Sequence, residues 1–235
     1  MQKTLRPSCN MEYLFMGMRR ILVGMSAVIM GGVMSAQDGT LDATFNPTDQ
    51  GFSLGDGPNY GISTINLEPD GKLFLGGAFT RFDSTQVGRV AQVNADGSLD
   101  TSFNPGGSGT GSPLTCSTIQ PDGKIIIAGY FSSYNGTGGQ FQLSRLIANG
   151  ALDASFTHVS GGVNASILTI SVQADGRIIS GGYFSLFGSM SRSRIARLNA
   201  DGSLDNSFDP GTGFYHVNGA QVQTVALQAD GKIIV

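Results

Sequence analysis

Short apolar runs alternate with turn residues along most of the chain. The run Ile167–Gln173 places Leu168, Ile170 and Val172 at every second position, with polar residues between them. That period of two predicts a β-strand. The run Lys124–Ala128 is apolar without alternation, and a strand that has no polar face is covered on both sides. We therefore expect this second kind of strand to lie inside a stack of sheets.

An Asp-Gly turn separates the two strands, and this arrangement recurs. The turn begins at Asp70, Asp122, Asp175 and Asp230. A second landmark, the box Leu-Asp-x-x-Phe, begins at Leu41, Leu99, Leu152 and Leu204. Successive turns are 52, 53 and 55 residues apart, and successive boxes are 58, 53 and 52 residues apart. Two independent landmarks with one period establish an internal repeat.

Each repeat contains two hairpins. A third strand, such as Arg89–Asn94, ends in another Asp-Gly turn, and the positive φ angles of Asp-Gly suit a tight hairpin. We expect the Leu-Asp-x-x-Phe box to form a fourth strand. Four antiparallel strands at this period are typical of a β-propeller blade, which buries its faces against neighbouring blades. The alternative is an elongated β-solenoid, whose coils are usually shorter than these units.

The predicted fold class is all-β, an incomplete β-propeller with about three full four-stranded blades and two partial ones. The full units are 62–103, 114–156 and 167–208, a partial unit covers 222–235, and a stray strand covers 40–45. Together they form a repeat region over 37–235. Because propellers need about four to eight blades to close, we expect the chain to be a fragment of a longer protein.

Both halves of the repeat carry a specific motif. The first reads Q-[PA]-D-G-[KR]-I-I-[IVS]-x-G-x-F and the second reads R-[IL]-N-A-D-G-S-L-D-x-S-F. Over Asp38–Val235 the chain resembles the delta-60 repeat family of bacterial secreted proteins. The resemblance implies a β-propeller-like fold in exported or surface proteins, and it implies no established activity. The middle unit departs from the pattern at Ala128, Gln142 and Asn149, which indicates that these positions tolerate change.

The first 36 residues differ from the repeats. Arg19 and Arg20 precede an apolar run, Ile21–Met34, which ends in the small residues Ser35 and Ala36. These are the three parts of a secretory signal peptide, cleaved after Ser35 or Ala36. A retained membrane anchor is the alternative, but the apolar run is short for a bilayer span of about 20 residues. We expect a secreted or cell-surface protein with no membrane span after cleavage.

Composition narrows the class of protein. The chain has 35 glycines among 235 residues, 13% charged residues and a mean hydropathy of +0.04, which is too apolar for a disordered chain. A net charge of −3 and the lack of a basic run after Arg20 argue against nucleic-acid binding. Cys9 precedes the cleavage site. Cys116 is then left without a disulfide partner, and we expect it to be a half-buried structural thiol.

Polar groups that recur with the repeat have a structural and a functional interpretation. Acidic residues in the turns either cap those turns or bind calcium, and we favour turn chemistry for Asp96, Asp100, Asp201 and Asp205. Arginines recur at two repeat positions. We expect them to pair with the Asp of a box rather than to line a rim for an anionic ligand: Arg89 and Arg194, Arg145 and Arg197.

Aromatic pairs spaced by two residues also keep the period, and we favour core packing over a carbohydrate-binding face. They are Phe79 and Phe82, Phe131 and Tyr134, and Phe184 and Phe187. The two histidines, His158 and His216, lack the paired spacing of a zinc site. No nucleophile elbow, phosphate loop or dinucleotide motif occurs. We therefore predict no catalytic, metal or cofactor-binding residues and no enzyme activity.

The loops between repeats vary in length and content, unlike the strands. They cover 46–61, 104–115, 157–164 and 209–221. If these loops share one rim of a propeller, a ligand would bind there. The candidate ligand residues are Tyr60, Phe214, Tyr215 and His216.

Three functions fit these patterns. The leading hypothesis is an exported, non-catalytic scaffold or binding module with a protein or carbohydrate partner at the cell surface. One alternative is a propeller hydrolase or lyase that acts on polysaccharide, which would require unlike Asp, Glu or His residues to converge from different blades. A second alternative is a calcium-stabilised adhesin, whose melting temperature would rise with calcium.

Overall fold

The computed structural model describes residues 57–138, 142–158, 162–214 and 219–235. The predicted signal peptide, 1–36, and the predicted stray strand, 40–45, lie outside the described residues. Every regular element in the described part is a β-strand, which confirms the all-β class. Within these residues no helix is long and apolar enough to cross a bilayer.

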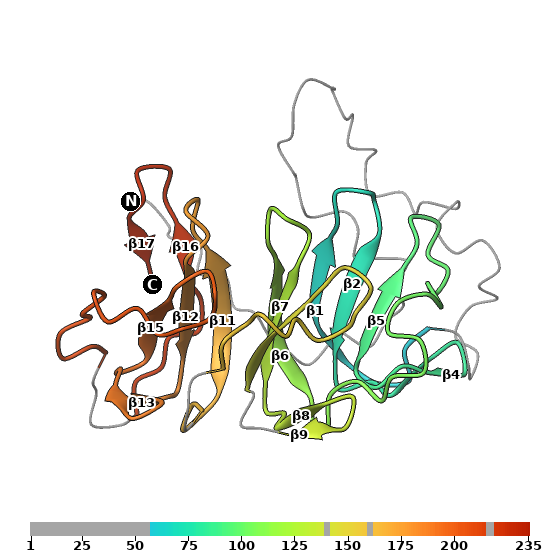
Figure 1. The fold of residues 1–235 in the computed structure, drawn as a ribbon, viewed down its shortest axis with the longest axis horizontal. Helices are drawn as coiled ribbons and strands as arrows, with labels where there is room; N and C mark the ends of the chain where they lie inside the picture. Colours follow the sequence, from blue (N-terminus) through green and yellow to red (C-terminus); the bar gives the residue numbers. More distant parts are fainter. Residues whose placement is uncertain (1–56, 139–141, 159–161, 215–218) are drawn as a thin grey trace, which may run out of the picture.

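Three antiparallel sheets follow one another along the chain and lie side by side as blades of an incomplete β-propeller (Figure 1). We call them blades 1, 2 and 3. Their strands are β1 (Ile62–Leu67), β2 (Leu73–Gly77) and β5 (Val90–Val93); β6 (Leu114–Ile119), β7 (Ile125–Gly129) and β10 (Leu143–Leu146); and β11 (Ile167–Val172), β12 (Ile178–Gly182) and β15 (Ile195–Leu198). A hairpin of β16 (Ala226–Leu227) and β17 (Ile233–Ile234) begins a fourth blade.

The box forms less of a strand than the sequence predicts. Each sheet has three strands, and the box leucine adds only one isolated bridge, as in the pair Leu146 and Leu152. The reason is local. The carboxylate of Asp153 accepts hydrogen bonds from the amide of Ser155 at 2.9 Å and from its hydroxyl at 2.6 Å, so the chain turns immediately after the bridge.

A small second hairpin, which the sequence did not predict, follows the second strand of each full blade. The three hairpins are β3 (Arg81–Phe82) with β4 (Thr85–Gln86), β8 (Ser133–Tyr134) with β9 (Thr137–Gly138), and β13 (Leu186–Phe187) with β14 (Met190–Ser191). Each carries one buried ring of the predicted aromatic pairs. All three lie at the same end of the blades, the lower edge in Figure 1.

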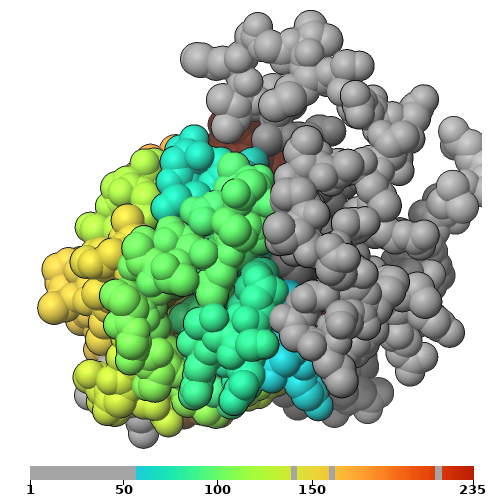
Figure 2. All heavy atoms as spheres, turned by 90° about the vertical axis from the view of Figure 1, so that its right-hand side faces the viewer, coloured from blue at the N-terminus to red at the C-terminus, as the bar shows by residue number. Residues whose placement is uncertain are grey.

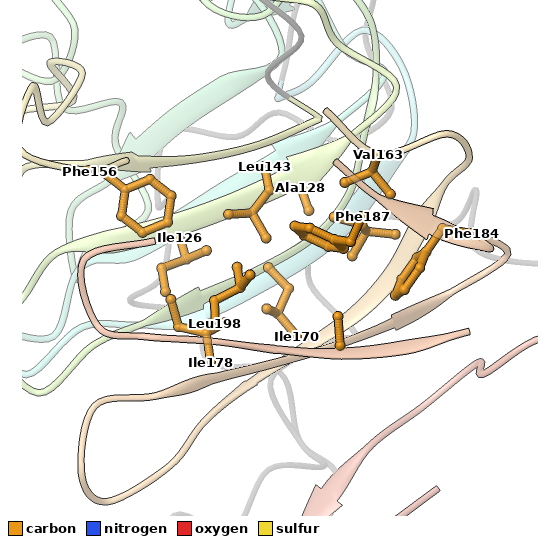
Figure 3. Packing of buried hydrophobic residues seen from close by; sticks show 12 residues of the cluster. Ile126, Ala128, Leu143, Phe156, Val163, Ile170, Ile178, Phe184, Phe187 and Leu198 are labelled. Carbon is orange, nitrogen blue, oxygen red and sulfur yellow. The ribbon is translucent and has the colours of Figure 1, made fainter. Parts of the chain in front are cut away.

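The core lies between the blades. Ile126 of β7 packs with Ile170 and Ile178 of blade 3 (Figure 3). Ile167 of blade 3 belongs to the same cluster. The neighbours of Ile126 in the chain, Ile125 and Ile127, pack on the other side with Phe74 and Val90 of blade 1. All three isoleucines of β7 have no exposed surface, which confirms that this strand is covered on both faces. In the space-filling view from the side of blade 1, the atoms of blades 1 and 2 form one continuous surface (Figure 2).

Polar side chains of the first strands connect each blade to the next. The hydroxyls of Thr64 in β1 and Ser117 in β6 lie 2.8 Å apart. The hydroxyl of Thr115 donates to the carbonyl oxygen of Ile167 at 2.5 Å, and that of Ser171 donates to the carbonyl oxygen of Val225 at 3.2 Å. The polar half of the alternating pattern therefore contributes to packing between blades, with its hydrogen bonds satisfied.

Glycines at the end of the second strand allow two close approaches. A Cβ on Gly181 would lie 2.5 Å from a methyl carbon of Val222, which precedes β16. A Cβ on Gly182 would lie 2.1 Å from the carbonyl oxygen of Ser166, which precedes β11 in the same blade. The first glycine therefore sets the distance between blades, and the second sets the distance within a blade.

We expect Gly182→Ala to lower the free energy of unfolding by about 1–3 kcal/mol, because the added carbon overlaps a backbone oxygen that cannot move without shifting β11. Urea unfolding measures the loss. Gly61→Ala is the matched control, because a Cβ there would meet nothing within 4 Å. Equal stability of the two variants would contradict the close approach.

Candidate ligand-binding face

The two ends of the blades carry different chemistry. We call the end with the Asp-Gly and Asn-Gly turns the turn face; it comprises 68–72, 94–100, 120–124, 147–153, 173–177, 199–205 and 228–232. The loop face is the other end, with the small hairpins and the connections between blades. It comprises the described residues of 57–61, 78–89, 105–113, 130–142, 158–166, 183–194 and 209–221. The loop face is the lower edge in Figure 1.

Acidic side chains of the turn face hold the turns. Asp96 accepts hydrogen bonds from the amide of Ser98 at 3.0 Å and from its hydroxyl at 2.6 Å, and Asp201 does the same with Ser203. These bonds lower the pKa of both carboxyls. These aspartates therefore stabilise the turns through hydrogen bonds, as the sequence predicts. No group of three or more His, Cys, Asp or Glu that could hold a metal occurs within the described residues.

A buried ion pair joins the third strand of a blade to its box. Nε of Arg145 donates to Asp153 at 2.8 Å, and the guanidinium lies 4.8 Å from the ring centre of Phe156. Nη1 of Arg145 also donates to the carbonyl oxygen of Ala200 in blade 3 at 2.6 Å. Blade 3 repeats the ion pair, with 2.8 Å between Arg197 and Asp205. The predicted pairing of Arg145 and Arg197 with box aspartates is confirmed.

The other pair of arginines does not reach a box. Arg89 donates to the carbonyl oxygen of Thr110 at 2.8 Å, and Arg194 donates to that of Tyr183 at 2.5 Å. Both have left-handed backbone, with φ of 72° and 74°, just before the third strand. The prediction of box pairing is wrong for these two residues, because the third strand begins after them at the loop face while the box aspartates lie at the turn face.

Blade 1 replaces the buried arginine by glutamine. Gln92 donates to Glu68, and Lys72 pairs with Asp100 at 2.6 Å. Burial raises the pKa of Glu68, and the hydrogen bond from Gln92 opposes the rise. Lys72 is partly exposed, so blade 1 keeps a cation beside its box aspartate without a buried guanidinium.

The isolated thiol and the described histidine have structural environments. Cys116 is half-buried, and burial raises the pKa of its thiol to about 12, although the neighbouring hydroxyl of Thr115 acts in the opposite direction. A thiolate is therefore disfavoured, which agrees with the predicted structural role. His158 lies edge-on to Phe156, and its Nε2 is 3.2 Å from the hydroxyl of Ser144. Burial lowers the pKa of His158.

The recurring aromatic pairs belong to the core. None of their rings is more than 2% exposed, which confirms core packing for Phe79, Phe82, Phe131, Tyr134, Phe184 and Phe187. They cannot form a carbohydrate-binding face.

Exposed aromatic rings gather instead on the loop face. Of the predicted ligand residues, Tyr60 is 66% exposed and Phe214 is 40% exposed, whereas Tyr215 and His216 lie outside the described residues. Sequence reasoning missed Tyr130 and Tyr183, which are 59% and 47% exposed. The sequence does contain a signal for these two tyrosines. Each immediately precedes a buried phenylalanine of the recurring pairs, so the alternation of an extended chain turns it outward.

A family model described as a domain of unknown function (DUF5122) β-propeller matches three segments of the chain, residues 68–103, 120–156 and 173–208. Each segment starts just before the Asp-Gly turn and ends at the box of one full blade. The matches therefore support the propeller repeat in all three blades. A search of curated proteins finds no match.

Solved structures that resemble the chain include a propeller domain, an extracellular domain and a lyase. They include the WD40 β-propeller domain of Doa1 (13% identity, TM-score 0.47, 74% of this chain and 47% of that one). The extracellular domain of the one component system BT4673 from B. thetaiotaomicron is similar over 76% of this chain and 20% of that one, with 14% identity and a TM-score of 0.45. Virginiamycin B lyase from Staphylococcus aureus is similar over 74% and 54%, with 18% identity and a TM-score of 0.40. The chain spans about half of these proteins or less.

The buried ion pair predicts an acid-sensitive fold. Burial raises the pKa of Asp153, but hydrogen bonds from Ser155 and Arg145 outweigh it and bring the pKa from 3.8 to about 2. A carboxylate whose pKa is lower in the folded state stabilises the fold above its unfolded pKa. That contribution is lost as pH falls from about 4 to about 2. We therefore expect the free energy of unfolding to fall steeply over this window.

Asp153→Asn should lower the free energy of unfolding by about 2 kcal/mol at neutral pH, since it leaves Arg145 buried without its anionic partner. It should also flatten the decline between pH 4 and pH 2, measured by urea unfolding at each pH. The control is Asp83→Asn on the exposed β3–β4 turn, which also removes one carboxylate but leaves the ion pair of Arg145 and Asp153 intact. Identical acid profiles for Asp153→Asn and the parent would contradict the assignment.

Proposed function

We propose that the chain is an exported, non-catalytic β-propeller of delta-60-type repeats that binds a ligand on its loop face. One observation carries the proposal. Tyr60, Tyr130, Tyr183 and Phe214 are exposed on the loop face, although a backbone hydrogen bond is made by each residue or by its neighbour in the chain. Exposed rings on one face of a soluble protein indicate an interaction surface, and tyrosine is among the residues that most often dominate binding energy.

The acidic residues support a non-catalytic role. Nine of the twelve acidic residues in the described part recur at three repeat positions of the turn face, where they hold turns or pair with cations. The other three have partners as well: Glu68 accepts from Gln92, Asp83 from the amide of Gly57, and Asp209 from the amide of Gly211. A glycosidase needs a pair of unlike carboxyls that face each other across a substrate. The contacts of the described acids favour a role in the fold instead.

The competing function, cleavage of polysaccharide, is tested directly. We expect the purified protein to release neither reducing ends nor unsaturated products from polygalacturonate or dextran during prolonged incubation. A commercial pectate lyase on the first polymer and a dextranase on the second verify that each assay detects cleavage. Release that follows the protein through purification would overturn the non-catalytic role.

Export rests on the arrangement of residues 19–36, where two arginines precede an apolar run and small residues. Expression of the full chain in a secreting bacterium should yield an extracytoplasmic protein whose first residue is Ala36 or Gln37, as determined by N-terminal sequencing. Replacing Val28 by Arg interrupts the apolar run and should leave the unprocessed chain inside the cell. An intact N-terminus in the parent protein would contradict a cleaved signal.

A further inference from the structure

The exposed tyrosines occupy one place in the blade architecture. The backbone amides of Ala78, Tyr130 and Tyr183 donate to the carbonyl oxygens of Gly61, Pro113 and Ser166, at 2.9, 3.1 and 2.9 Å. These bonds make the three positions equivalent, at the loop-face end of the first two strands. Blade 1 has Ala78 there, and its tyrosine, Tyr60, lies next to Gly61 on the facing segment. Each full blade therefore presents one exposed tyrosine at this level.

The position of the tyrosine differs between blades. In blades 2 and 3 the residue at the repeat position of Tyr60 is small, Ser112 and Ala165, and the tyrosine follows the second strand instead. The backbone beneath is anchored, because Phe131 and Phe184 directly after the tyrosines have no exposed surface. A ring on such a support loses little conformational entropy when it is covered. We define Tyr60, Tyr130 and Tyr183 as the tyrosine rim.

The tyrosine rim and the turn face differ in the charge of the residues around them. Ten of the twelve acidic residues of the described part lie on the turn face. The loop face has Arg81, Arg89 and Arg194, together with the buried Arg192, against Asp83 and Asp209. Both aspartates accept backbone amides, and all of these arginines except Arg81 donate to backbone carbonyl oxygens. Arg194 donates to the carbonyl oxygen of Tyr183 itself, at 2.5 Å, so a fixed positive charge lies beside one rim position. An anionic ligand is therefore favoured.

We propose that the tyrosine rim binds an acidic polysaccharide, a chain of sugar rings that carry carboxylates. The inference rests on the proposed function and names the class of its ligand. Tyrosine offers a flat apolar ring for the C–H face of a sugar and a hydroxyl for its polar edge. One ring per blade suits a polymer that repeats the same unit. The arginines supply the charge that a carboxylate on each unit requires.

Polygalacturonate tests the inference, and dextran is the uncharged comparison. The chain has no tryptophan, so its intrinsic fluorescence comes from its six tyrosines, three of which form the rim. We expect polygalacturonate to change this fluorescence saturably, to bind more weakly as salt rises, and to bind at least about tenfold more tightly than dextran. Calorimetry of the same mixtures gives the affinity independently.

Separate variants test how much the tyrosine rings and the arginine charge each contribute to polygalacturonate binding. Tyr130→Ala with Tyr183→Ala should weaken polygalacturonate binding about tenfold or more, while melting temperature stays near that of the parent because both rings are exposed. Arg81→Gln, at the exposed residue of β3, should weaken polygalacturonate binding and reduce its salt dependence. Leu67→Ala, at the end of β1 next to the turn face, with Ile147→Ala on that face removes two exposed apolar side chains and should change neither the binding nor its salt dependence.

Three results would overturn the inference. Equal, salt-insensitive binding of dextran would reject an acidic ligand. Full binding by the tyrosine double variant would reject the rim, and no binding of polygalacturonate would reject the ligand class. All three leave a non-catalytic binding module standing. That role would instead fail if the protein cleaved either polymer, which the release assay detects separately.

Discussion

Burial of the second strand on both faces is the constraint on which the structure depends. The isoleucines of β7 alternate between two neighbours, with Ile126 against blade 3 and Ile125 and Ile127 against blade 1. A single sheet of three strands cannot cover such a strand. Each blade is therefore stable only with blades on either side, and stability is shared between nearest neighbours along the chain.

Close stacking explains the residues that recur beside the isoleucines. Gly181 allows the side chain of Val222, in the next blade, to approach closely. The hydroxyl of Thr115 donates to the carbonyl oxygen of Ile167 in the next blade instead of to water. Arg145 adds a bond from blade 2 to the turn of blade 3. Blade 1 does without that arginine, so the ion pair reinforces the stack rather than creating it.

Because hydrogen bonds and ion pairs occupy the turn face, the two ends of the propeller have different roles. The aspartates there cap turns and hold arginines, which keeps the hairpins in register. The loop face contains the segments that differ from blade to blade, and its exposed rings lie outside the core. Function can therefore change on that face while the repeat is retained.

The sequence alone determined the period, the hairpin turns, the two-faced strand and the burial of the aromatic pairs, because each is a local pattern with a local physical cause. It also predicted the pairing of Arg145 and Arg197 with box aspartates. It missed that the box is a bridge and a turn, since side-chain bonds from Asp153 end the strand. Only the tertiary structure shows that Tyr60, Tyr130 and Tyr183 lie at the same level of their blades. It also shows that Arg89 and Arg194 lie at the opposite end of the sheets from the box aspartates. Those placements depend on which end of each sheet a residue occupies, and strand pairing decides this rather than spacing along the chain.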